Sequence, residues 1–117
     1  MLDRILEDLI AAVRGASAAL FLDGDGEMIA QAGDANLEIG LRGAWKEIHL
    51  DQIKEITATL RLGPVQAVLF SLDDGNELIT PVSTDYSLVL FLSSYSDLRQ
   101  AMNATAKAID MILRDIA

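Results

Sequence analysis

The segment LFLDGDGEMIA, residues 20–30, contains the residue types from which metal and phosphate sites are built. Asp23 and Asp25 would supply the first oxygen ligands of a calcium loop, and Gly24 and Gly26 would let the backbone approach a phosphate closely. A third interpretation is the turn of a β-hairpin, because Asp-Gly pairs accept the positive φ angles that hairpin turns require.

The residues that follow decide against both kinds of ligand site. A calcium loop needs a glycine at its sixth position, where this chain has Met28. A phosphate loop needs a third glycine where the chain has Ile29, and it opens a helix, whereas strands are expected on both sides of this segment. We therefore expect residues 23–26 to form a hairpin turn and the protein to hold no metal ion.

Few other residues are candidates for catalysis. His49 is the only histidine and the chain has no cysteine, which excludes thiol chemistry and a His-rich metal site. We interpret His49 as a surface or interface residue. Asp73 and Asp74 precede Gly75 between two expected strands, so turn formation explains them. We therefore expect a protein that is not an enzyme and needs no cofactor.

Composition narrows the class of partner. The 117 residues include 9 Lys and Arg against 18 Asp and Glu, a net charge of −9 that nucleic acid and anionic membranes would repel. No apolar run is long enough to span a membrane, and the N-terminus does not resemble a secretion signal. The sequence predicts one cytoplasmic domain, residues 1–117, that is half hydrophobic and rich in aliphatic side chains.

Hydrophobic periodicity and turn residues divide the chain into eight elements. Apolar residues at helical spacing predict three helices, at residues 2–14, 36–62 and 97–116. Apolar runs of strand length predict five strands, at residues 17–23, 27–32, 65–72, 76–83 and 86–94. Asp97 stands three residues before Gln100, which predicts a cap at the start of the last helix. This order of helices and strands predicts an α+β domain.

The helix at 36–62 has two apolar stripes, rotated about 90° from each other at 100° per residue. The first stripe comprises Leu37, Leu41, Ala44, Trp45 and Ile48, and the second comprises Ile53, Ile56 and Leu60. Two interpretations stay open. The helix breaks near residues 49–52, with Asp51 capping a second piece, or it is continuous and buries two adjacent faces.

Two features of this helix have alternative interpretations. Trp45 is either a core residue, which we favour, or an anchor at a protein interface. Four of the nine cations, Arg42, Lys46, Lys54 and Arg61, lie in the helix with acids between them. That alternation is typical of a solvated face.

The strand at 65–72 is apolar on both sides. Val65, Ala67 and Leu69 should point one way, and Val68, Phe70 and Leu72 the other. Such a strand needs cover on both faces. If it lies at the edge of a sheet, it will recruit another chain.

The whole chain resembles the Roadblock/dynein light-chain superfamily, and in particular its short prokaryotic members of the MglB type. The resemblance rests on apolar and turn residues in a shared order. They are Leu6, Leu9, Gly15, Ala18, Ala19, Asp23, Gly26, Ile29, Ala30, Leu62, Gly63, Gly75, Leu78, Ile79, Pro81, residues 88–92, Ile109 and Leu113.

The resemblance implies a profilin-like fold, with a five-stranded antiparallel sheet in the order 2-1-5-4-3. The long middle helix would cover one face and the terminal helices the other. The strand at 65–72 would then lie at an edge, and Pro81 should end its strand or sit at a bulge. A PAS-like sensor shares the strand order, but it would have several short helices in place of the long one.

The resemblance also implies a function. Such proteins are non-enzymatic regulators or scaffolds that form homodimers by pairing this edge strand, with the two middle helices side by side. Members of the MglB type bind a small Ras-like GTPase and stimulate GTP hydrolysis without inserting an arginine. A dimeric scaffold with no effect on hydrolysis is the alternative. Because the sequence ends at Ala117, we expect no contacts of the kind that relatives make through a C-terminal extension.

By the same resemblance, the expected surfaces are as follows. The dimer interface would use Val65, Gln66, Ala67, Val68, Leu69, Phe70, Leu41, Ala44 and Ile48. The GTPase would bind Arg42, Trp45, Lys46 and His49.

Overall fold

A computed structural model describes residues 1–34 and 36–117. Within them the chain forms α1 (Leu2–Ala12), β1 (Ala16–Asp23), β2 (Met28–Gly33), α2 (Leu37–Thr59), β3 (Val68–Leu72), β4 (Gly75–Pro81), β5 (Tyr86–Leu92) and α3 (Leu98–Ile116). The strands form one antiparallel sheet in the order β2-β1-β5-β4-β3. The predicted fold class and strand order are confirmed.

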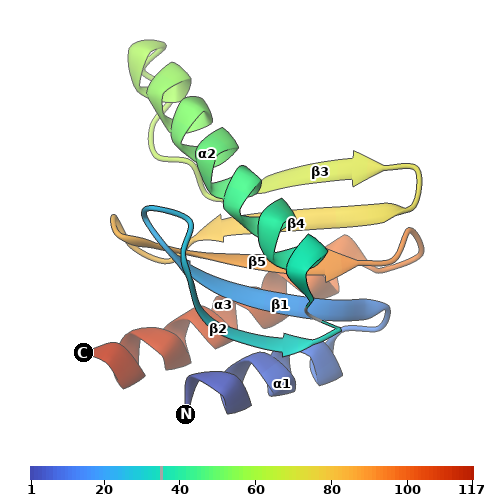
Figure 1. Ribbon diagram of the computed structural model, residues 1–117. Helices are drawn as coiled ribbons and strands as arrows, with labels where there is room; N and C mark the ends of the chain where they lie inside the picture. Colours follow the sequence, from blue (N-terminus) through green and yellow to red (C-terminus); the bar gives the residue numbers. More distant parts are fainter. Residues whose placement is uncertain (35) are drawn as a thin grey trace.

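The sheet separates two layers of helix (Figure 1). Helices α1 and α3 cover one face, where Leu6, Phe21 and Ile112 belong to the larger hydrophobic core. Helix α2 crosses the other face, where Leu20, Leu50 and the inward side chains of β4 and β5 form a smaller core. Each face of the central strands is therefore buried, which explains their nearly continuous apolar sequences.

The Asp-Gly segment is the hairpin turn between β1 and β2, as predicted. The Asp23 carboxylate accepts hydrogen bonds from the backbone N–H groups of Asp25 (2.9 Å) and Glu27 (3.0 Å). Gly26 has a φ of 82°, which a glycine adopts without strain. The carboxylate is thus occupied in holding the turn.

Helix α2 is continuous, so of the two interpretations left open, the break near residues 49–52 is wrong and the unbroken helix is correct. The Asn36 side chain caps its start by accepting a hydrogen bond from the Ile39 N–H at 2.9 Å. At the position of the expected break, Leu50 is fully buried against the sheet, and this packing holds the helix together. The last turns of α2 project beyond the sheet (Figure 1).

Strand β3 is shorter than predicted. It begins at Val68, which pairs with Ile79 of β4. In the same register Gln66, two residues earlier in the chain, would lie opposite Pro81. Pro81 ends β4, as expected, and has no N–H with which to extend the ladder. Because residues before Val68 leave the strand, Val65 packs with Val68 and Phe70 on the α2 side and not with Ala67.

At the far end of the chain, the predicted cap of α3 is present. The Asp97 carboxylate accepts hydrogen bonds from the N–H groups of Arg99 (2.9 Å) and Gln100 (3.2 Å). These bonds satisfy backbone donors that the first turn of a helix leaves free.

Candidate interaction surface

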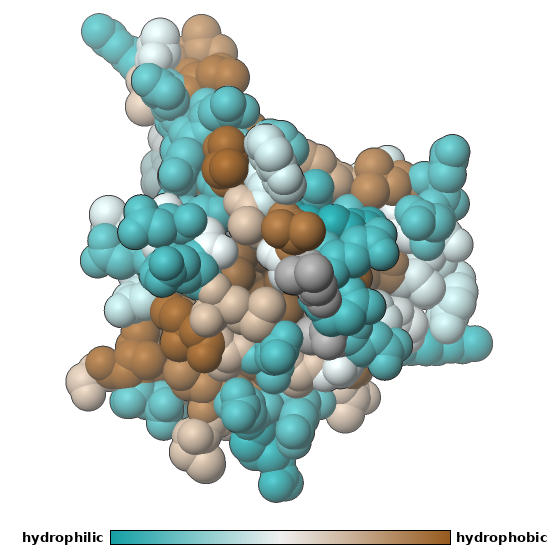
Figure 2. All heavy atoms as spheres, in the orientation of Figure 1, coloured by the Kyte–Doolittle hydropathy of each residue, from teal (hydrophilic) through white to brown (hydrophobic). Residues whose placement is uncertain are grey.

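The outward face of α2 carries a row of large apolar side chains. We call this row the α2 stripe: Leu41, Trp45, Ile48, Ile56 and Leu60, all exposed. Trp45 is 58% exposed, so its favoured interpretation as a core residue is wrong. Figure 2 shows hydrophobic side chains along α2 on the face toward the viewer. The side chain of Leu37, predicted in the same row, lies outside the described part of the structure.

The stripe faces outward because small and polar residues occupy the face that meets the sheet. Gly43 lies over β1, where an added Cβ would be only 2.5 Å from a methyl carbon of Leu20. Glu47 and Leu50, one and two turns further on, are buried on the same side. Since the helix and the sheet approach this closely at Gly43, a larger side chain is excluded at that position.

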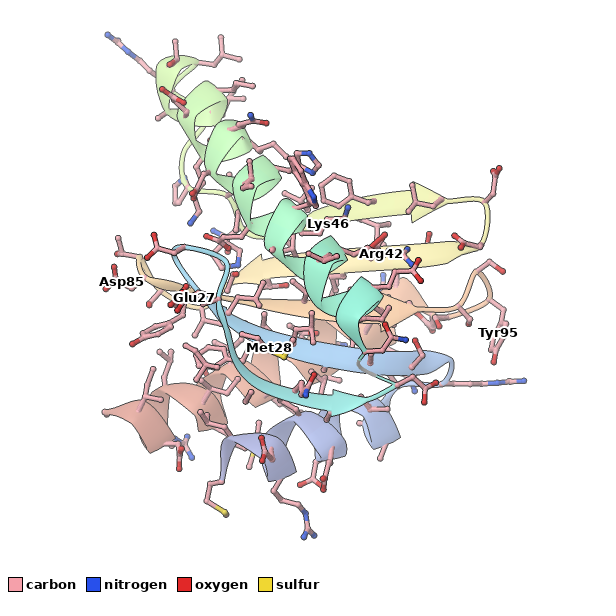
Figure 3. All side chains as sticks on the ribbon, viewed as in Figure 1. Glu27, Met28, Arg42, Lys46, Asp85 and Tyr95 are labelled. Carbon is pink, nitrogen blue, oxygen red and sulfur yellow. The ribbon has the colours of Figure 1, made fainter. Side chains whose placement is uncertain are left out.

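A buried carboxylate links α2 to β4. The Glu77 side chain is 2% exposed, and its Oε2 accepts a hydrogen bond from Arg42 at 3.0 Å. The Lys46 Nζ lies 4.0 Å from the other carboxylate oxygen and 4.4 Å from the centre of the Phe70 ring. The hydrogen bond to Glu77 is the main cause that raises the pKa of Arg42. Figure 3 labels both cations on the side of α2 toward β3 and β4.

His49 lies between two aromatic rings. Its ring centre is 5.9 Å from that of Phe70 and 6.2 Å from that of Trp45. Its Nδ1 is buried, with no hydrogen-bond partner in the described residues. His49 is therefore half-buried at the border between the stripe and β3.

A second buried carboxylate fixes α2 to β5. Glu47 accepts a short hydrogen bond from the Ser87 hydroxyl beneath the helix. Burial raises the pKa of Glu47, and the hydrogen bond from Ser87 opposes part of that rise. The group thus favours its protonated form more than an exposed glutamate does.

Strand β3 is one of the two edge strands of the sheet, and β2 is the other. Within the described residues β3 pairs with β4 alone, so one row of its backbone N–H and C=O groups has no strand partner. Leu69 and Leu72 are exposed on it. An unprotected apolar edge of this kind is a template for pairing with another chain.

The structure brings most of the predicted interface residues to one side of the molecule. Val68, Leu69 and Phe70 lie in β3, while Val65, Gln66 and Ala67 lead into it. Leu41 and Ile48 are exposed on the stripe. Ala44 instead lies against its own chain, since a Cβ on Gly26 would be 3.3 Å from the Ala44 Cα.

The predicted partner-binding residues differ in how far their side chains are exposed and in whether they are bound to Glu77. Trp45 is free, His49 is half-buried, and Arg42 and Lys46 are bound to Glu77, with side chains 34% and 12% exposed. The interpretation of the α2 charges as one solvated face is therefore wrong for Arg42, Lys46 and the buried Glu47. Sequence reasoning missed Glu77. The sequence does contain a signal for Glu77. It is a carboxylate inside an apolar strand, and two cations four residues apart on a helix complement its charge.

Neither a metal-binding group of side chains nor a membrane-spanning helix is found among the described residues. Across residues 1–34 and 36–117, no three acidic or histidine side chains are grouped closely enough to hold a metal ion. In the same residues, no helix has both the length and the apolar character needed to cross a membrane. What the region offers is an apolar surface beside a strand that is paired on one edge alone.

Solved structures with the same fold support the resemblance found in the sequence. A Roadblock/LC7 domain from Streptomyces avermitilis superposes with a TM-score of 0.91 at 15% identity, over 97% of this chain and 96% of that one. MglB of Myxococcus xanthus gives 0.89 at 14% identity, over 98% and 94%. MglC of Myxococcus xanthus gives 0.68 at 27% identity, over 98% and 99%.

Comparison of the sequence with models of known protein families and with curated proteins gives no match. The fold is thus that of the solved Roadblock/LC7 domain and of MglB, which share it with this chain over nearly their whole length.

Proposed function

We propose that this protein is a non-enzymatic homodimer that regulates a small Ras-like GTPase through its paired α2 helices. The observation that carries the proposal is the position of the α2 stripe beside β3, since His49 packs between Trp45 of the stripe and Phe70 of this edge strand. Monomeric proteins rarely expose apolar side chains in such a contiguous group, and where they do the group is usually a binding site.

The first step of the proposal is dimerisation through β3. Two copies of β3 related by a two-fold axis can pair antiparallel, which satisfies both rows of edge groups and extends the sheet across the dimer. The same axis brings the two α2 helices together on one face of the joined sheet. Leu69, Phe70, Leu41 and Ile48 are the residues of α2 and β3 that we assign to this contact.

The second step assigns the rest of the stripe to the GTPase. Trp45 is its most suitable anchor, since it is large, exposed and flanked by the half-buried His49. Tryptophan is enriched among residues that dominate binding energy. Arg42 and Lys46 contribute by holding α2 in place, since both are engaged with Glu77.

The bound state of Arg42 bears on the mechanism. An arginine that stabilises phosphoryl transfer must reach into the partner's active site. Here the Arg42 guanidinium is held at 3.0 Å from a buried carboxylate. The proposed regulator therefore acts by changing the conformation of the GTPase's own switch loops. The same observation is equally compatible with the second candidate, a dimeric scaffold that binds the GTPase without changing its hydrolysis.

The test uses the full chain and Ras-like GTPases of the same host, each loaded with GTP. We expect one of them to bind, and Trp45→Ala to weaken that binding about tenfold or more, as is typical of a buried aromatic anchor. Tyr95→Ala is the matched control, because Tyr95 is an exposed aromatic residue, 68% against 58% for Trp45, that lies before α3 and outside the stripe.

Hydrolysis measured in the same mixtures separates the two candidates. Faster release of phosphate with the wild-type chain supports the regulator, and unchanged release with intact binding supports the scaffold. Binding that is equally strong for wild type and Trp45→Ala would overturn the proposed surface.

A further inference from the structure

Two aspartates form the turn between β3 and β4. Asp73 and Asp74 lie between Leu72, which ends β3, and Gly75, which begins β4. Both are exposed, and within the described residues neither forms an ion pair. We propose that this acidic turn binds, in a second copy of the chain, a cationic hollow beneath the last turns of α2. The inference deepens the proposed function, because it rests on the β3 pairing of two copies.

The hollow lies between the last turns of α2 and the segment that leads into β3. Its volume is about 620 Å³, and residues 63–65 and Pro81 form the walls that face the helix. The described residues that line it include two cations, Lys54 and Arg61, and no acid. Neither cation forms an ion pair in the described part of the chain. In a chain with 18 acidic residues against 9 cations, a hollow with cations alone is a site for a carboxylate.

The two cations continue the face of α2 that meets the sheet. At 100° per residue, Lys54 lies about 40° and Arg61 about 20° around the helix from Leu50. Leu50 is fully buried on the sheet, whereas the last turns of α2 project beyond it (Figure 1). The sheet-facing side of α2 therefore becomes cationic where the sheet of its own chain ends. A sheet extended by a second copy would continue beneath it.

Antiparallel pairing of two complete β3 strands fixes which residues meet. Strand β3 has five residues, so pairing all of them places Phe70 on the two-fold axis. Leu72 and Gly75 pair across the two-residue turn. Such a closing pair exchanges hydrogen bonds, and bonded and non-bonded pairs then alternate along the strand. By this alternation the backbone groups of Leu69 and Ser71 point to the free edge, and full pairing places these two residues opposite each other.

The same register carries the partner's turn to the hollow. Continued beyond the strand, it places the partner's Asp73 opposite Ala67 and the partner's Asp74 opposite Gln66. The next residue, Val65, lines the hollow. Helix α2 projects past the sheet near the start of β3, and the β3–β4 turn lies at the other end (Figure 1). Because paired strands run in opposite directions, the partner's turn reaches the end where α2 projects, and the two-fold axis makes this contact twice.

The consequence of this contact is selectivity for a second copy of the chain. Backbone hydrogen bonds at a free edge do not depend on side chains, so β3 alone would accept other strands. Aspartates that meet cations on both sides of the axis favour the antiparallel copy over strands that lack an acidic turn.

Two variants reverse the charges on the two sides of the contact. The turn variant carries Asp73→Lys and Asp74→Lys, and the hollow variant carries Lys54→Glu and Arg61→Glu. In sedimentation equilibrium each variant alone should dimerise about tenfold more weakly than wild type, because like charges meet at both contacts. In an equal mixture the turn of each variant meets a hollow of opposite charge. The mixture should therefore form a heterodimer with an affinity close to that of wild type.

Mixing separates this contact from effects within one chain. Lys54 also interacts with the buried Glu47, and Asp74 interacts with Arg42. Losses that arise from these two interactions would persist in the mixture, whereas losses at the contact between copies would be restored. Raising the salt concentration should narrow the difference between each variant and wild type, since exposed charges are screened.

A matched control makes the same charge change elsewhere. Arg99→Glu combined with Lys107→Glu reverses one arginine and one lysine on α3, and should leave dimerisation unchanged. If either double variant does not fold, the exposed single substitutions Asp73→Lys and Arg61→Glu repeat the mixing experiment.

Two results would overturn this contact alone. They are variants that dimerise as tightly as the wild-type dimer, and weakened dimerisation that mixing does not restore. A folded wild-type protein that stays a single chain would instead overturn the homodimer of the proposed function, and this contact with it.

Discussion

Helices α1 and α2 cover opposite faces of one sheet with opposite distributions of side chains. The buried residues of α1 are Ile5, Leu6 and Leu9, and its charges point to solvent. In α2 the sheet-facing positions include Gly43 and the buried Glu47, while the α2 stripe points outward. Helix α1 therefore buries its apolar side chains within its own chain, whereas α2 leaves most of its large apolar side chains exposed.

The way each helix is attached explains how α2 remains in place. Helix α1 is held by apolar burial, which is non-directional. Helix α2 is held by the single buried Leu50, by close approach at Gly43 and by two buried carboxylates, Glu77 bound to Arg42 and Glu47 bound to Ser87. Directional bonds of this kind hold a helix in position without burying its large apolar side chains, which remain exposed.

The largest expected effect is the difference in the free energy of unfolding between the same Leu→Ala substitution in α1 and in α2. Leu6→Ala should lower the free energy of unfolding by about 3 kcal/mol, since Leu6 is fully buried. Leu41→Ala, on the exposed stripe, should change it by less than about 0.5 kcal/mol. Urea denaturation measures both, at concentrations low enough for the chain to be monomeric. Equal losses would contradict the described role of the stripe.

A smaller loss is expected at the link between α2 and β4. Glu77→Gln removes the carboxylate that faces Arg42 and Lys46, and should cost about 2 kcal/mol, less than a fully enclosed ion pair because Arg42 is partly exposed. Asp8→Asn breaks the exposed Arg4–Asp8 pair and should cost less than about 0.5 kcal/mol. If the two substitutions cost the same, the buried link does not hold α2.

The smallest effect concerns pH. Because burial raises the pKa of Glu47 in the folded state, folding favours the protonated carboxyl. The stabilisation is present at acidic pH and is lost as the pH rises through the folded pKa. Glu47→Gln imitates the protonated form and still accepts the Ser87 hydrogen bond. Its stability relative to wild type should therefore be higher at pH 8 than at pH 4.5, by less than the Glu77 effect.

Thermal unfolding of Glu47→Gln and wild type across this pH range provides the measurement. Asp51 and Asp23 push the Glu47 pKa in the same direction as burial, while Lys54 opposes it, so all three are kept unchanged. A stability difference between Glu47→Gln and wild type that does not vary with pH would contradict the buried state of Glu47.

Sequence reasoning predicted the parts of the molecule that depend on local patterns. The period of α1, the turn at residues 23–26 and the cap at Asp97 follow from neighbouring residues alone. For α2 the pattern identified apolar stripes but not what covers them, so Trp45 was placed in the core. Periodicity reports that a face is apolar and does not distinguish burial within the chain from burial by a partner.

The candidate site was harder to predict because its contacts are distant in sequence. Glu77 meets Arg42 across 35 residues, and that contact depends on the register of β4 and the tilt of α2 over the sheet. The late start of β3 at Val68 likewise depends on Pro81, which lies in the neighbouring strand. Such contacts follow from tertiary structure and have no local signature.

The most direct test of the account is the mass of the protein in solution. Light scattering at concentrations up to about 100 µM should give twice the mass of one chain. Leu69→Glu on β3 should reduce it to one chain through like-charge repulsion across the two-fold axis, whereas Leu98→Glu, at the same 39% exposure in α3, should leave it doubled. A folded wild-type protein that stays a single chain throughout would contradict the claim that a second copy covers the β3 edge.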